Sequence, residues 1–407
     1  MRVRLVVLVL AVAAGTLWLA GGGAPQSVAA APPAAAPSAA DPCTFPTSMV
    51  GSPAETAWRI FVAANCPAPG NQMVWETWIE QNALYPASGV AGPGAKAKRL
   101  HGSPLFHATM ARKKGLTAEL NPSSDCNPMG GPPANVVKGA TICEEVHINP
   151  SAQSYISGQG YEVRSGQTKA AQAGAHIQFP PIAIEVKVDW VPGTDFQPPF
   201  TCANPPKGVH VETIDGVCYA MAGMHIASKL EPNWIWATFE PQNLQTNPNR
   251  CITFGPCHDA WGSIPAVSNG GAGGFTKLTP ALQTWMTNAH LSPEFFNYRM
   301  DGTQTQFGTT AHPTLLGNSV IEGENVGMTK GTASCITCHS VSSIENNGTD
   351  GITKINNQVG PEYVVPAGWI ARDFVWSLAL ACPGGIQTCT SSAPAPTKKP
   401  QGKPKRR

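Results

Sequence analysis

Residues 335–339 read Cys-Ile-Thr-Cys-His, and this pattern constrains the surrounding fold more than any other feature of the chain. C-x-x-C-H is the pattern by which proteins attach haem covalently. Two thiols at this spacing can form thioethers with the vinyl groups on one edge of a porphyrin, and the adjacent imidazole then lies beneath the iron. We therefore expect one covalent haem c, attached at Cys335 and Cys338, with His339 as the proximal iron ligand.

Two other interpretations of these cysteines are weaker. A thioredoxin-like C-x-x-C needs a βαβ context, and none is visible in the sequence around it. A structural zinc site needs four ligands in two closely spaced pairs, whereas the only later cysteines, Cys382 and Cys389, are more widely spaced. Covalent haem is therefore the favoured interpretation.

The N-terminal segment has the features of a secretory signal peptide. Arg2 and Arg4 are followed by an apolar run and then by small residues up to Ala31. An uncleaved anchor is the alternative, but the regular small-residue ending favours cleavage. We expect a signal peptide over residues 1–30, an Ala/Pro linker over 31–42 and export to the periplasm. No later stretch approaches the ~18 apolar residues of a spanning helix, so we expect no transmembrane segment after cleavage.

Cysteine usage agrees with an oxidising compartment. The chain has 12 cysteines, and the ten outside the haem motif are an even set suited to disulfide bonds. We expect each to pair with its neighbour in sequence, because short loops close most readily. The expected pairs are Cys43 and Cys66, Cys126 and Cys143, Cys202 and Cys218, Cys251 and Cys257, and Cys382 and Cys389.

Charge is sparse and unevenly distributed. Charged residues make up 13% of the chain, against a usual share of ~25%, while Gly and Pro number 41 and 39. This composition indicates a loop-rich and strand-rich protein and argues against a helical bundle. The formal net charge is +2, but it falls to −6 without the two arginines of the signal peptide and the six basic residues of the tail. The Pro-rich basic tail, residues 391–407, is expected to be disordered and to act as a solubilising end. Contact with an anionic surface is the alternative, and nucleic-acid binding is the weakest of the three interpretations.

Hydrophobic periodicity predicts an α+β fold. A helix is expected over 54–64, because Ser52, Pro53 and Glu55 form a capping box with Pro at the first helical position. Period-two alternation or β-branched and aromatic runs predict strands over 182–190, 219–226 and 234–239. Helices are expected over 281–289, 293–300 and 367–381. We therefore expect a strand-rich, disulfide-bonded domain over 43–280 and a helical, cytochrome-c-like haem region over 281–390.

Several longer segments together resemble a known family. They are VWETW (74–78), IAIEVKVDW (182–190), GMHIASK (223–229), WIWATFE (234–240), NYRMDGTQ (297–304), GNSVIE (317–322), SCITCHS (334–340) and DFVWSLALA (373–381). In this order they resemble a largely uncharacterised family of exported bacterial monohaem proteins described as cytochrome c family. The resemblance covers most of the mature chain and implies a haem protein, but no substrate. Family members often have a histidine where this chain has Pro241, so no role for that histidine is transferred.

The second axial ligand of the iron has to come from upstream of the motif, or the sixth position is open. Residues 340–407 contain neither methionine nor histidine. The candidates are His225, on a strand-like segment, and Met328, seven residues before Cys335. Three further candidates have no special argument: Met300, His290 and His312.

We therefore expect a periplasmic monohaem c-type cytochrome that carries single electrons to or from a redox partner protein. The first alternative is a haem enzyme or a gas or redox sensor with an open sixth iron position. The second is a Trp-rich binding module in which the haem reports the redox state. An electron carrier is favoured over a catalyst, because neither a nucleophile elbow nor a phosphate-binding glycine loop is present in the sequence.

Overall fold

The computed structural model describes residues 41–85, 126–128, 141–214, 216–242, 259, 261–264, 276–312, 314–318, 333–351 and 360–381. The expected signal peptide, most of the expected linker and the basic tail lie outside these residues, as does Met328. The same holds for Cys251, Cys257, Cys382 and Cys389. Expectations about these parts of the chain stay predictions.

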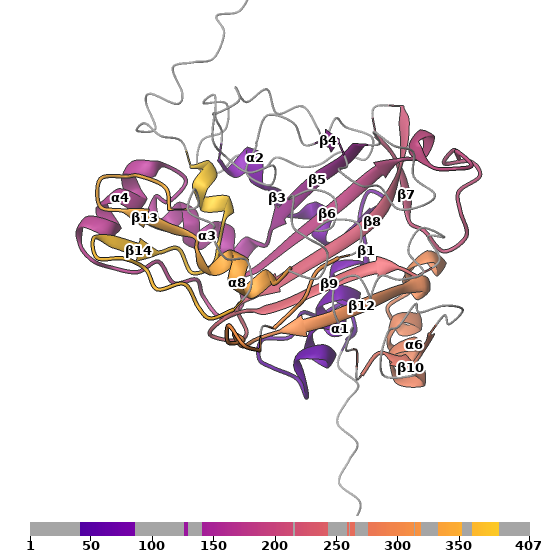
Figure 1. Ribbon diagram of the computed structural model, residues 1–407. Helices are drawn as coiled ribbons and strands as arrows, with labels where there is room; N and C mark the ends of the chain where they lie inside the picture. Colours follow the sequence, from indigo (N-terminus) through magenta and orange to yellow (C-terminus); the bar gives the residue numbers. More distant parts are fainter. Residues whose placement is uncertain are drawn as a thin grey trace, which may run out of the picture. The chain divides into compact units, whose positions relative to one another are not determined.

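An antiparallel sheet of eight strands is the main element of the fold (Figure 1). Its strands are β3 (Ile79–Glu80), β4 (Cys126–Pro128), β5 (Thr141–Ile148), β6 (Ile184–Pro192), β7 (Val211–Ile214), β8 (Val217–Ser228), β9 (Ile235–Pro241) and β12 (Tyr298–Gln304). They pair in the order β12-β9-β8-β6-β5-β3, with β4 also beside β5 and β7 also beside β8. The strands expected over 182–190, 219–226 and 234–239 are confirmed as β6, β8 and β9.

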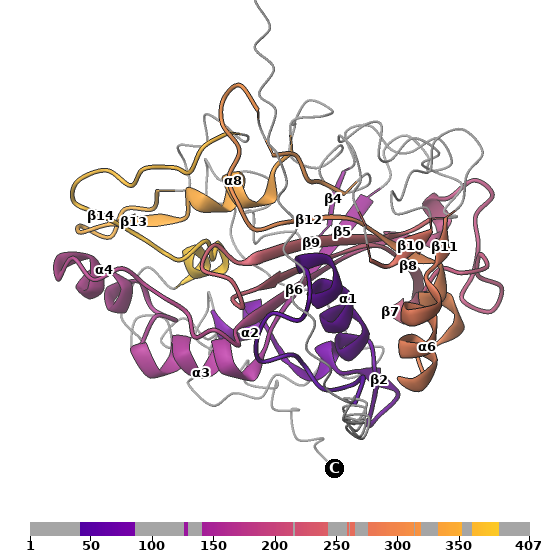
Figure 2. The same ribbon diagram turned by 90° about the horizontal axis from the view of Figure 1, so that it is seen from below.

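One face of the sheet is covered by α1 (Pro53–Ala64), as Figure 2 shows. Ser52 is confirmed as the N-cap, because the backbone N–H of Glu55 donates to Ser52 Oγ at 3.1 Å and Pro53 opens the helix. The Glu55 carboxylate of the expected capping box accepts hydrogen bonds from Arg59. On the apolar side of the helix, the ring of Phe61 stacks on that of Phe239 of β9 with centroids 4.4 Å apart. Trp58 meets the same ring edge-on at 4.9 Å. This face of the sheet therefore holds an aromatic core.

The opposite face of the sheet carries α8 (Cys335–Ser340), the helix of the C-x-x-C-H motif (Figure 2). Near it lies a two-stranded antiparallel sheet of β13 (Ser343–Glu345) and β14 (Trp369–Ala371). Ile336 of α8 is fully buried in a second hydrophobic cluster, which also contains Trp236 of β9. The haem motif is therefore packed on a sheet rather than inside a helical bundle.

Two helices occupy a stretch in which no helix is expected from the sequence: α3 (Pro150–Gln159) and α4 (Arg164–Gln172). For α3 a signal was present. Asn149 Oδ1 accepts a hydrogen bond from the N–H of Ala152 at 3.0 Å, Pro150 is the first helical residue, and Gly160 ends the helix in the left-handed conformation with φ 67°.

The helical character expected beyond residue 280 holds only in part. The helix over 281–289 is confirmed as α6 (Pro280–Asn288). The helix over 293–300 is wrong in its second half, because the 3-10 helix η4 (Pro293–Asn297) leads directly into β12. Backbone pairing with β9 satisfies the hydrogen bonds of these last residues, so they extend the sheet. The sheet thus includes residues from both expected regions.

The helix expected over 367–381 is also wrong. This stretch forms β14 and the short 3-10 helix η6 (Ser377–Leu380). Between them, Asp373 and Phe374 have φ values of 52° and 70°, which are incompatible with a right-handed helix. The apolar spacing that suggested a helix arises because a strand and a separate turn both bury their apolar residues, among them Ile370 and Leu378.

The remaining elements are short. They are β1 (Pro67–Ala68), β2 (Gln72–Met73), η1 (Trp75–Thr77), α2 (Gln81–Leu84), η3 (Gly193–Asp195), β10 (Ser263–Ile264) and β11 (Lys277–Leu278). Among the residues that the structure describes, no helix has the length and apolar character needed to cross a membrane.

Two of the expected disulfide bonds are confirmed: Cys43–Cys66 and Cys202–Cys218. Cys143 is also disulfide-bonded, and Cys126 lies opposite it in the register of β4 and β5. Short-range cysteine pairing is therefore the rule within the described part of the chain.

Candidate functional site

Helix α8 is fixed to the end of strand β12 by one side chain, that of Gln304. Its Oε1 accepts a hydrogen bond from the backbone N–H of Ile336 at 3.1 Å, and its Nε2 donates to Ser334 Oγ at 3.2 Å. The N–H of Ile336 is in the first turn of the helix, where it has no partner within the helix. An edge strand of the sheet therefore caps the helix that carries the haem motif.

Beneath α8, the sheet presents two rows of side chains from neighbouring strands. In one row, Lys187 of β6 lies opposite His225 of β8. In the next row, Glu185 of β6 lies opposite Ala227 of β8, which lies opposite Trp236 of β9. Residues two apart on a strand point to the same face, so the two rows share one face. Lys187, His225, Glu185 and Trp236 therefore converge on the side of the sheet that α8 covers.

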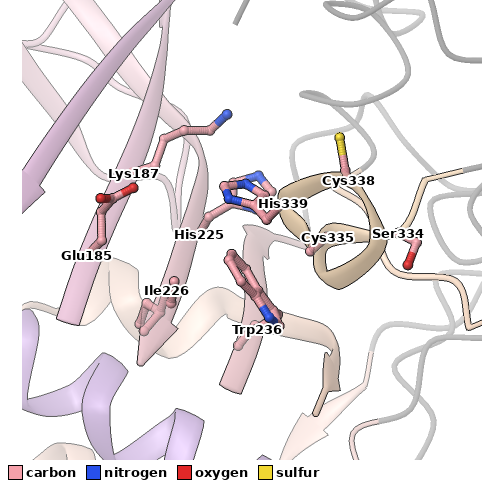
Figure 3. A pocket seen from close by; sticks show the side chains of 11 residues that line it. Glu185, Lys187, His225, Ile226, Trp236, Ser334, Cys335, Cys338 and His339 are labelled. Atoms are coloured by element: carbon pink, nitrogen blue, oxygen red, sulfur yellow. The ribbon is translucent and has the colours of Figure 1, made fainter. Parts of the chain in front are cut away.

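A cavity between α8 and these strands holds the candidate residues (Figure 3). Cys335, Cys338 and His339 line it from the helix, and His225 lines it from the sheet. The empty space between these side chains, open mouth included, is about 600 Å³. His225, His339 and Lys187 all line this cavity (Figure 3). The structure thus brings together four residues singled out in the sequence.

The other proposed ligands do not lie at this cavity. Met300 is buried in the aromatic core on the opposite face of the sheet. His290 and His312 are exposed. Of the candidates that the structure describes, only His225 shares the cavity with the haem motif.

The imidazole of His339 is held in one orientation. Its Nδ1 lies 2.9 Å from the carbonyl oxygen of Phe374, so Nδ1 carries the proton and donates. The indole of Trp376 stacks on the ring with centroids 4.8 Å apart and an angle of 19°, and Trp236 packs against it at 4.4 Å. This arrangement leaves Nε2 as the nitrogen for a metal, as is usual for metal-binding histidines whose other nitrogen donates to a carbonyl.

Both histidines of the cavity are neutral at neutral pH. Burial lowers the pKa of His339 to about 4; the hydrogen bond to Phe374 opposes this effect and the charge of Lys187 adds to it. Burial also lowers the pKa of His225 well below its ordinary value, and the charges of Lys187 and His339 act in the same direction. Each ring is partly accessible from the cavity, but protein atoms surround most of it, and this burial lowers its pKa. Neutral imidazole is the form that binds a metal.

Two charged side chains complete the lining. Lys187 Nζ lies 3.1 Å from Glu144 Oε2. Burial raises the pKa of Glu185 to about 7, although the hydroxyl of Ser377 donates to its Oε2 at 3.1 Å. Both side chains also line a second cavity of about 410 Å³, which borders His339 on the side of Trp376.

The donor set fits a covalently attached haem. Cys335 and Cys338 line the cavity, and neither forms a disulfide bond. One neutral imidazole follows them with Nε2 available, and a second faces the same cavity from the sheet. Within the described part of the chain there is no cluster of three or more His, Cys, Asp or Glu that could hold a metal ion.

Sequence reasoning missed the residues that surround this set. Glu185 and Lys187 belong to the alternating segment 182–190, so their shared face was readable, but not which face would meet the haem motif. The carbonyl of Phe374 carries no sequence signal, because any residue offers one. Comparisons with protein-family models, with curated proteins and with solved structures give no match to this chain.

Proposed function

We propose that this protein is an exported, periplasmic monohaem c-type cytochrome that carries single electrons. Haem c, attached through Cys335 and Cys338, would supply the one-electron Fe(III)/Fe(II) chemistry, with His339 and His225 as axial ligands. One observation carries the proposal: the two thiols, the oriented imidazole and a second imidazole from the sheet all line one cavity. The disulfide bonds support the proposed compartment, because they persist in oxidising surroundings.

The chain's own residues prepare the iron site. The carbonyl of Phe374 holds the Nδ1 proton of His339, which fixes the tautomer and raises the basicity of Nε2. His225 projects from β8, which is paired on both sides by β6 and β9. A ligand on a central strand is held more firmly than one on a loop. Small rearrangement between oxidation states suits an electron carrier.

The surroundings of the site set its reduction potential. Trp236 and Trp376 pack against His339 and bury much of its ring. Burial of this kind and nearby charge are among the protein's levers on the potential of a haem iron. The cation of Lys187 disfavours added positive charge in the cavity, so it favours the reduced state.

A second candidate function, a haem enzyme or a gas or redox sensor, is favoured by Glu185. Its carboxyl group lines the same cavity as the two thiols, and its raised pKa of about 7 suits proton exchange at neutral pH. In this function the sixth iron position is open to a small ligand.

Absorption spectra of the full mature chain, oxidised and reduced, with and without CO, test the proposal. An electron carrier with two axial ligands gives a reduced spectrum that CO leaves unchanged. Rapid CO binding by the reduced wild-type protein would contradict the carrier and favour the open-site enzyme or sensor. The proposal includes a redox partner protein, and the spectra can be measured without it.

A further inference from the structure

The turn between β14 and η6 has an unusual backbone. Asp373 and Phe374 are both in the left-handed region, at φ 52° and 70°. Asp enters this region more readily than most residues, but a bulky aromatic residue there is a conformational outlier. Nearby left-handed positions in the same region are glycines, among them Gly360 and Gly368. A turn that only had to reverse the chain would have no need of this strain.

The strained turn delivers one functional group. It directs the carbonyl of Phe374 at Nδ1 of His339, 2.9 Å away. The Phe374 ring is only partly buried and lies between Trp236 and Phe307, with centroids 6.1 and 6.0 Å away. The main contribution of the turn to the site is therefore its backbone oxygen.

A clamp of hydrogen bonds holds the turn in place. Asp373 Oδ1 lies 2.6 Å from Lys229 Nζ, and its Oδ2 accepts from the backbone N–H of Phe179 at 2.7 Å. Lys229 Nζ also donates to the carbonyl of Pro232 at 2.6 Å. The carboxylate and the ammonium are largely buried, with side-chain exposures of 7% and 14%. Hydrogen bonds between charged partners in such surroundings are among the stronger ones.

The clamp connects the turn to the sheet residues of the site. Lys229 directly follows β8, the strand of His225, and Pro232 lies in the connection that leads into β9, the strand of Trp236. The turn that orients His339 is thus tied to the hairpin that presents the other imidazole.

We propose that Asp373 and Lys229 are positioning residues for His339: their ion pair holds the strained turn so that the Phe374 carbonyl fixes the Nδ1–H tautomer and presents Nε2 to the cavity. The orientation of the His339 ring can be measured in the chain without haem. The effect of this orientation on an iron atom rests on the proposed function. In a haem-bound chain, loss of the carbonyl contact makes Nε2 a weaker donor and raises the reduction potential.

The first test uses the full mature chain without haem, as the variant Cys335→Ala/Cys338→Ala. Histidine-selective ¹⁵N NMR at neutral pH, assigned with a His339→Gln variant, reports the tautomer of His339. We expect a single Nδ1–H form in this background. Asp373→Asn keeps side-chain size and left-handed propensity but removes the charge, and it should give a mixture of tautomers. Lys229→Met should do the same, whereas Lys229→Arg keeps the cation and should stay close to the background.

A matched control separates positioning from general destabilisation. Asp259 is a buried carboxylate that accepts from Trp58, Gly262 and Ser263 in the core beside α1. Asp259→Asn should lower the melting temperature and leave the His339 tautomer unchanged. If Asp373→Asn loses its native circular dichroism, the comparison of Lys229→Met with Lys229→Arg decides whether the clamp sets the His339 tautomer. An unchanged tautomer in natively folded Asp373→Asn, or in natively folded Lys229→Met, overturns the proposal.

The second test uses the chain with its haem-attachment cysteines, made in a host that attaches haem. Asp373→Asn should raise the reduction potential, and Lys229→Arg should leave it near the wild-type value. If the His339 tautomer changes in the clamp variants but the protein acquires no haem, the positioning role is supported and the proposed function is contradicted. If haem is attached covalently but neither the reduction potential nor the His339 tautomer changes in the clamp variants, the proposed function is supported and the positioning role is contradicted.

Discussion

At the scale of single residues, the two imidazoles of the cavity come from different kinds of element. His339 is part of the motif on α8, and its ring is fixed by the Phe374 carbonyl and by Trp376. His225 is fixed by its strand, since β8 is hydrogen-bonded on both sides. Sequence separates the two by more than a hundred positions, and the register of the sheet brings them to one site.

Substitution of His225 tests its role as the second axial ligand. His225→Ala should leave haem attached through Cys335 and Cys338, because it touches neither thioether. It should open the sixth iron position, so that the reduced variant binds CO and the wild type does not. The exposed His312 provides the matched control, and His312→Ala should be spectrally silent. A His225→Ala spectrum identical to that of the wild type, with no CO response, would remove His225 from the iron.

The residues of the site differ in how far sequence could predict them. Cys335, Cys338 and His339 are local in sequence, so their spacing alone carries the prediction. His225 was one of several candidates, because a lone histidine on a strand has no spacing to identify it. The contacts of Lys187 and Phe374 depend on which strand lies beneath α8, a long-range property that no local pattern encodes.

At the scale of elements, strand β7 is joined to η4 by a histidine between two carboxylates. His210, just before β7, lies 3.1 Å from Glu212 and 3.1 Å from Glu294. Burial alone would lower the pKa of His210, but its hydrogen bonds to the two carboxylates outweigh this, and its pKa is raised. Burial also opposes ionisation of Glu294, but His210 holds the pKa of Glu294 below its ordinary value.

This cluster should make stability depend on pH. A raised histidine pKa stabilises the fold fully below the unfolded value of ~6.5, and the contribution is lost as pH rises through the folded value. A lowered glutamate pKa contributes above ~4.3 and is lost as pH falls through the folded value. The cluster is therefore most stabilising between these limits.

Chemical denaturation of His210→Gln and wild type across pH checks this expectation. The variant should be less stable by about 1.5–3 kcal/mol near pH 5.5, with a smaller difference near pH 9, since hydrogen bonds to charged groups carry about that energy. The exposed His312 provides the control, and His312→Gln should be as stable as the wild type at both pH values. A stability difference that stays constant from pH 5.5 to 9 would contradict the assignment.

Elements were predictable where local signals and burial agree. The segment 182–190 alternates in sequence and forms β6, because its apolar residues face the core beside α1. The segment 367–381 has helical spacing but forms a strand and a 3-10 turn. There, tertiary contacts of Asp373 with Lys229 and Phe179 hold a backbone that no propensity favours. Local prediction failed at this strained turn, as it did where η4 leads into β12.

At the scale of the whole molecule, disulfide bonds close short loops beside the sheet. Cys43–Cys66 spans 23 residues and ties the N-terminal segment to the end of α1. Cys202–Cys218 spans 16 residues and ties the segment after η3 to β8. In the loop-entropy account, closing loops of this length stabilises a protein by about 3 kcal/mol each.

We expect all ten cysteines outside the haem motif to be paired in the exported protein. Alkylation of unfolded, unreduced protein followed by mass spectrometry should label none of them. The double variant Cys43→Ala/Cys66→Ala should lose about 2–5 kcal/mol of unfolding free energy while keeping haem attached. Two or more labelled cysteines in the wild type would instead indicate a redox pair or a metal site.

Covalent haem at Cys335 and Cys338 is the central claim, and intact mass measurement of the denatured mature protein tests it most directly. The protein should be made in a host with haem-attachment machinery. The predicted result is a mass increase of one haem per chain, together with haem-dependent peroxidase staining on a denaturing gel. Both signals should be lost in Cys335→Ala/Cys338→Ala. A wild-type mass without haem, or a haem signal that persists in the double variant, would contradict the account.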